Sequence, residues 1–105
     1  MLVEVGKAST IPEGEARRFT ANGTDVAVVN LGNGHFLGVD DICSHAESSL
    51  SEGEVDLEEE TVECPRHGSV FDLRSGRPRS LPATLPVRSF PVKVQGDAIL
   101  IEVED

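Results

Sequence analysis

Apolar side chains in this chain gather in short segments, and no segment keeps a helical period for more than about two turns. Residues 25–31 form a continuous β-branched run, which predicts a buried strand. Residues 35–39 predict its partner, because residues 32–34 between them (Gly-Asn-Gly) are typical of a hairpin turn. Residues 2–5 and 15–20 carry weaker strand patterns, and the second of these predicts an edge strand.

The C-terminal part predicts a second hairpin. Residues 87–94 should pair with residues 98–103 across a tight turn at residues 95–97. Pro91 lies within the first of these segments and indicates an edge position or a bulge, since proline has no backbone N–H to donate. Between the two hairpins, residues 42–86 lack a strand pattern, and a long irregular stretch in a small domain is usually functional.

Length and charge narrow the class of protein. A chain of 105 residues fits one domain, which we expect to be all-β, a small antiparallel sandwich or barrel over residues 1–105. Asp and Glu number 19 against 9 Lys and Arg, a net charge of −10, which argues against binding to nucleic acids or anionic membranes. We find no apolar run of about 20 residues and no signal-peptide pattern, so we expect a cytoplasmic protein with no membrane anchor.

Two cysteines and two histidines give the irregular stretch its chemistry. Cys43 and His45 form a Cys-x-His arm, and Cys64 and His67 form a Cys-x-x-His arm, so two loops could bring four ligands to one site. A tetrahedral zinc accepts two thiolates and two imidazoles. A [2Fe–2S] cluster accepts the same set, with two ligands on each iron. A disulfide between the cysteines is a third alternative.

The spacing favours iron over zinc. Structural zinc sites usually pair like ligands within an arm, Cys with Cys and His with His. Each arm here is mixed, which lets each loop give one ligand to each of two irons.

These residues resemble the signature of the Rieske [2Fe–2S] family, Cys-x-His with Cys-Pro-x-His-Gly. Ser69, Phe71 and Gly76 continue the resemblance, which covers essentially the whole chain. It implies a Rieske domain with an inserted cluster-binding subdomain at about residues 42–73, holding one [2Fe–2S] cluster per chain. It also implies the ligand set: Cys43 and Cys64 on one iron, His45 and His67 on the other.

The chain departs from the respiratory-complex members of this family. Ser48 and Arg66 stand where those members carry two further cysteines, and Phe71 stands where they carry a tyrosine. Ser69 is kept. Because a hydrogen bond to cluster sulfur stabilises the reduced state, the missing hydroxyl predicts a midpoint in the lower part of the range of about −150 to +300 mV.

The pattern is similar to the Rieske-type ferredoxins of bacterial ring-hydroxylating dioxygenase systems. That resemblance implies an electron carrier rather than an enzyme, with a flavoprotein ferredoxin reductase and a terminal Rieske oxygenase as partners, and we expect a monomer. Two alternatives stay open: the Rieske-like small subunit of an assimilatory nitrite reductase, and a zinc-stabilised interaction module.

Eight acidic residues and no Lys or Arg lie between residues 47 and 63. They fit either a solvated face or a docking surface for a basic redox partner. Arg74, Arg77 and Arg79 follow shortly after, and pairing between them and the acidic stretch would weaken the docking interpretation.

Overall fold

The computed structural model describes residues 1–43, 48–66, 68–81 and 85–103. Within these residues the chain forms strands and two short 3-10 helices, and none of the described helices has the length and apolar character needed to cross a membrane. The elements are, in order, β1 (Leu2–Lys7), η1 (Ala8–Thr10), β2 (Ala16–Ala21), β3 (Thr24–Asn30), β4 (Phe36–Asp40), η2 (Leu50–Glu52), β5 (Glu54–Asp56), β6 (Thr61–Glu63), β7 (Val70–Asp72), β8 (Ser89–Phe90), β9 (Val92–Gln95) and β10 (Ala98–Glu102).

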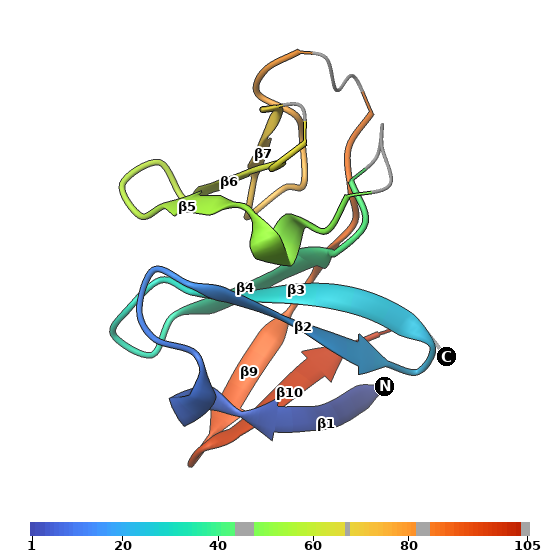
Figure 1. Ribbon diagram of the computed structural model, residues 1–105. Helices are drawn as coiled ribbons and strands as arrows, with labels where there is room; N and C mark the ends of the chain where they lie inside the picture. The colour runs from blue at the N-terminus through green and yellow to red at the C-terminus, as the bar shows by residue number, and fades with distance from the viewer. Residues whose placement is uncertain (44–47, 67, 82–84, 104–105) are drawn as a thin grey trace.

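The strands form three antiparallel sheets. The first sheet has the order β1-β10-β9, the second β2-β3-β4-β8 and the third β5-β6-β7. Figure 1 shows them as layers, with the second sheet between the first sheet below and the smaller third sheet above. The all-β antiparallel prediction is therefore confirmed.

Strand β3 explains this layering. Val26 and Val28 point into an apolar cluster shared with β10 of the first sheet, whereas Ala27 and Val29 point into a second cluster shared with the third sheet. A strand buried on both faces needs apolar residues at successive positions rather than alternation. The continuous β-branched run in the sequence is therefore the mark of the central strand of the molecule.

The C-terminal prediction is correct in part. The hairpin of β9 and β10 is present, but residues 87–94 are not one strand: β8 pairs with β4 in the second sheet, and β9 pairs with β10 in the first. The chain passes from one sheet to the other at Pro91, which lacks the N–H that a continuous ladder needs. Both β8 and β9 are edge strands, as the proline indicated.

The middle of the chain is more regular than its sequence suggests. Residues 42–86 contain the whole third sheet, whose three strands have three residues each. β5 begins and ends with an acidic residue, and β6 and β7 each end with one. Asp and Glu have low strand propensity. The strands form because Val55, Val62 and Phe71 lie opposite one another in register and face the apolar cluster beneath.

Candidate metal centre

The first cysteine lies on a short antiparallel ladder between residues 41–43 and residues 48–50. The backbone N–H of Leu50 donates to the carbonyl oxygen of Asp41 at 2.6 Å, and the N–H of Cys43 donates to that of Ser48 at 2.9 Å. Ile42 and Ser49 form an isolated antiparallel bridge between these two rungs. Three successive pairings therefore fix the backbone position of Cys43.

The second cysteine lies at the tip of the hairpin that β6 and β7 form. The N–H of Cys64 donates to the carbonyl oxygen of Ser69 at 2.7 Å, and the N–H of Gly68 donates to that of Cys64 at 2.9 Å. Gly68 adopts a φ of 73°, a left-handed conformation that glycine adopts without steric cost. The chain thus turns tightly at the residue that follows the Cys-x-x-His arm in the sequence.

The two loops share one construction. In each, the cysteine is the first residue of a six-residue segment, and its N–H donates to the carbonyl oxygen five residues later. By sequence, His45 and His67 fall inside these segments. Both histidines lie outside the described residues, so the arrangement fixes where the two thiols stand and leaves the imidazoles as a prediction.

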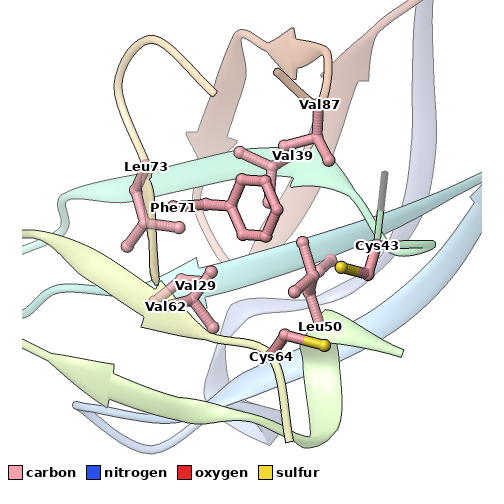
Figure 2. Packing of buried hydrophobic residues seen from close by; sticks show 10 residues of the cluster. Val29, Val39, Cys43, Leu50, Val62, Cys64, Phe71, Leu73 and Val87 are labelled. Atoms are coloured by element: carbon pink, nitrogen blue, oxygen red, sulfur yellow. The ribbon is translucent and has the colours of Figure 1, made fainter. Parts of the chain in front are cut away.

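Both cysteines are buried in the apolar cluster beneath the third sheet. Cys43 is 3% exposed and Cys64 is fully buried, and both are thiols rather than halves of a disulfide. Figure 2 shows the two side chains at the same end of this cluster, on either side of Leu50, with the ring of Phe71 nearby. The disulfide alternative is therefore not the state of this fold.

This donor set fits an iron–sulfur or zinc group. A thiolate is costly to bury in an apolar environment unless a metal or a cation neutralises it. Two cysteines from separate loops in one apolar cluster are suited to ligating a metal together. The described residues alone hold no group of three or more His, Cys, Asp or Glu side chains placed to bind a metal, so the set is completed only if the two histidines join it.

Ser69 and Phe71 lie next to the thiols. Both are fully buried, Ser69 supplies the carbonyl oxygen that closes the Cys64 loop, and Phe71 packs in the same cluster as both cysteines. The apolar ring shields the thiols from water but offers no hydroxyl. Phe71, which replaces the tyrosine of the respiratory-complex members, therefore lies close to the candidate ligands.

Part of the acidic stretch is paired inside the fold. Arg74 forms an ion pair with Glu60, and Arg79 pairs with Glu59 at 3.0 Å and with Asp72 at 3.7 Å. The hydrogen bond from Arg74 holds the pKa of Glu60 below its usual range. The predicted internal pairing is thus confirmed for Arg74 and Arg79.

Asp72 shows a balance of opposing effects. Burial raises the pKa of Asp72. Hydrogen bonds from the backbone N–H groups of Ser75 and Arg74, together with the charge of Arg79, lower this pKa by more, so that it lies below its usual value. The carboxylate thereby fixes the turn that follows β7.

One buried residue near the site was not singled out from the sequence. Asp41 is fully buried and accepts a hydrogen bond from the backbone N–H of Ser51 at 2.9 Å. The sequence signal for Asp41 is its position two residues before Cys43. That signal is too weak to predict that Asp41, rather than its neighbour Asp40, is the buried carboxylate.

Comparison with known proteins identifies similar chains. Residues 1–91 match the model of the Rieske [2Fe-2S] domain. The ferredoxin component of biphenyl 2,3-dioxygenase from Rhodococcus jostii (strain RHA1) is 39% identical over 103 residues, which are 98% of this chain and 94% of that protein. The ferredoxin of carbazole 1,9a-dioxygenase from Nocardioides aromaticivorans IC177 has 35% identity and a TM-score of 0.92, with 99% of each chain covered.

Two further solved structures are similar to this chain. A complex of reduced oxygenase and oxidised ferredoxin in carbazole 1,9a-dioxygenase contains a chain with 33% identity and a TM-score of 0.85, covering 98% of this chain and 97% of that one. A nitrite reductase small subunit from Mycobacterium tuberculosis has a TM-score of 0.86 but only 19% identity. The likeness covers 100% of this chain and 97% of that one. The second likeness concerns the fold alone.

Proposed function

The chain belongs to the Rieske [2Fe-2S] domain family, and on that premise we propose that it carries single electrons from an NAD(P)H-dependent flavoprotein reductase to a terminal oxygenase. Domains of this family bind a [2Fe–2S] cluster, which supplies one reversible one-electron redox step when bound. The relatives with 35–39% identity are named as ferredoxins or ferredoxin components, not as catalytic subunits. The chain is accordingly a carrier with no substrate turnover of its own.

The proposed ligands are Cys43 and Cys64 on one iron and His45 and His67 on the other. Support comes from the spacing of the two arms and from the two buried thiols at the starts of matching loops. On this proposal residues 42–73 are the cluster-binding part of one domain that spans residues 1–105.

The chain's own groups hold the thiols in place and keep them dry. The N–H groups of Cys43 and Cys64 are tied to Ser48 and Ser69, which limits movement of each thiol relative to its loop. Leu50 and Phe71, both fully buried, exclude water from the thiol side of the site. A rigid, dry surrounding suits electron transfer, since little has to rearrange when the charge changes.

The observation that carries the partner proposal is the solved oxygenase–ferredoxin complex, whose ferredoxin shares 33% identity over nearly this whole chain. The reductase is proposed from the resemblance to dioxygenase ferredoxins. We also propose a cytoplasmic monomer, because residues of one chain form both apolar clusters and the proposed reductase takes its electrons from a nicotinamide cofactor.

The alternatives differ in measurable ways. The nitrite reductase reading rests on a fold likeness at 19% identity, against 39% for a dioxygenase ferredoxin component. It predicts stable co-purification with one large subunit. The zinc module predicts a colourless protein with one zinc per chain.

Ligand substitutions with matched controls test the proposal. Cys43→Ser and Cys64→Ser should each abolish the iron content and the visible absorbance of the purified protein, while Ser89→Ala at an exposed position should change neither. The wild-type protein should be reduced by NADH through a flavoprotein ferredoxin reductase and reoxidised by a terminal oxygenase. A protein with iron that neither accepts nor delivers electrons in this assay contradicts the carrier role.

A further inference from the structure

Asp41 is an unusual group in this fold. Its side chain is fully buried, and Oδ1 accepts a hydrogen bond from the N–H of Ser51 at 2.9 Å. Oδ2 is also buried and has no hydrogen-bond partner among the described residues. Buried carboxylate oxygens are nearly always satisfied, so such an atom calls for an explanation.

A cation lies just beyond hydrogen-bond distance of this oxygen. Nη1 of Arg18, on β2, stands 3.9 Å from Oδ2 of Asp41. The Arg18 side chain is 56% exposed, whereas that of Asp41 is fully buried. The arrangement is a buried negative charge balanced from the surface by a partly solvated positive one.

Asp41 faces the same interior as the first candidate ligand. Along the ladder, Asp41 is buried, Ile42 is 49% exposed and Cys43 is 3% exposed. This alternation places the side chains of Asp41 and Cys43 on one face, roughly 7 Å apart along an extended backbone. The carboxylate therefore lies beside the thiol, with no intervening residue on that face of the strand.

We propose that Asp41 is a positioning residue that holds the base of the Cys43 loop and whose charge, balanced by Arg18, lowers the reduction potential of the group bound at the thiols. The inference rests on the proposed cluster site. Reduction adds negative charge, and a fixed negative charge nearby in a low-dielectric interior opposes it. Arg18 acts in the opposite direction, and more weakly, because solvent screens its exposed side chain.

Charge-neutral variants of the pair test this role. Asp41→Asn keeps the acceptor for the Ser51 N–H and removes the charge, and Arg18→Gln removes the balancing charge at the surface. Glu4→Gln and Arg17→Gln are matched controls, because both residues are exposed and Arg17 is the neighbour of Arg18 on the same strand. The measurement is the midpoint potential of the holo-protein, read by optical and EPR titration.

We expect opposite shifts from the two members of the pair. Asp41→Asn should favour reduction by on the order of tenfold in the equilibrium constant, which is about 59 mV upward. Arg18→Gln should shift the midpoint downward by less, and the shift should shrink at high salt. Both controls should leave the midpoint unchanged.

A purely structural role gives a different result. In that case both variants lose stability or iron while their midpoints stay at the wild-type value or move in the same direction, and the proposal is overturned. If Asp41→Asn fails to fold, the surface variant Arg18→Gln decides alone: no downward shift relative to Arg17→Gln overturns it. A wild-type protein that binds no iron overturns the proposed function and this inference together, whereas a normal cluster without these shifts overturns the inference only.

Discussion

Ser69 shows how a single residue links the loop to the chemistry of the site. Its backbone carbonyl accepts the N–H of Cys64, and its side chain is fully buried. The family resemblance implies that its hydroxyl donates to a cluster sulfur, and such a bond stabilises the reduced state. The backbone role and the hydroxyl role can be separated, because alanine keeps the first and removes the second.

Ser69→Ala is expected to lower the midpoint potential while the cluster is retained. Removing one donor to sulfur makes reduction less favourable, with an effect on the order of tenfold in the equilibrium constant, or about 59 mV. Ser89→Ala on β8 is the control. An unchanged midpoint in Ser69→Ala would show that this hydroxyl does not contact the cluster.

For individual residues, the sequence predicts those features of the candidate site that depend on residue type and spacing. The two cysteines were singled out from their spacing, and Cys43 and Cys64 lie in one apolar cluster. Asp41 could not be predicted in the same way, since its burial depends on the packing of η2 and β2 around the ladder. The positions of His45 and His67 remain a prediction.

Among the elements, the connection between the third sheet and β8 depends on one glycine. Gly76 has a φ of 77°, and a Cβ at this position would lie 2.0 Å from the carbonyl oxygen of Val87. The N–H of Val87 donates to the carbonyl oxygen of Gly76 at 2.8 Å. The close approach joins the segment after β7 to the strand that enters the second sheet.

Gly76→Ala should therefore destabilise the protein by more than a positive φ alone explains. Gly34→Ala is the matched control, because Gly34 has a φ of 75° but a Cβ added there would meet nothing within 4 Å. We expect the control to cost about 1 kcal/mol from backbone strain and Gly76→Ala to cost several times as much, measured by urea unfolding. Equal losses of unfolding free energy in the two variants would show that the backbone at Val87 moves away from the added Cβ without cost.

Asp72 predicts a pH dependence for the same region. Because its pKa is lowered in the folded state, its contribution to stability is complete above the unfolded pKa of about 4 and is lost as the pH falls through the lower, folded value. Asp72→Asn should lower the melting temperature by a few degrees at neutral pH, and this difference should vanish in acid.

The control for Asp72 is Asp56→Asn. Asp56 accepts backbone N–H bonds from Glu58 and Glu59 in a similar turn, but no ion pair joins it to an arginine in the described part of the chain. Its substitution should give a smaller loss at neutral pH. A difference for Asp72→Asn that persists unchanged to low pH would contradict the assigned cause.

Strands were predictable where both of their faces are buried or where glycine and asparagine mark the turn between them. β3, its hairpin with β4 and the edge position of β2 follow from the sequence. The third sheet does not, because its three-residue strands have acidic ends and depend on Val55, Val62 and Phe71 finding a core built by distant residues.

For the whole molecule, charge is the main feature beyond the fold. The net charge is −10, and the outer face of the third sheet carries Glu54 directly opposite Glu63. Like charges facing each other across strands are unfavourable for folding. Our hypothesis is that this face meets a basic redox partner, even though Glu59 and Glu60 are paired internally.

This hypothesis predicts that electron transfer from the reductase slows as salt rises. The double variant Glu54→Gln/Glu63→Gln should lower the second-order rate constant several-fold at low salt, and Glu4→Gln/Glu15→Gln, at exposed positions outside the third sheet, should have less effect. Rates that do not depend on salt, or equal effects of the two double variants, would assign this acidic face to solubility alone.

The central claim is a mixed-ligand [2Fe–2S] centre held by Cys43, His45, Cys64 and His67, and one measurement tests it most directly. The protein is purified without oxygen, and its optical and low-temperature EPR spectra are recorded before and after dithionite, with metal analysis. The account predicts a red-brown oxidised form and a rhombic EPR signal on reduction. A protein that stays colourless and EPR-silent after reconstitution with iron and sulfide, or that contains one zinc, would contradict it.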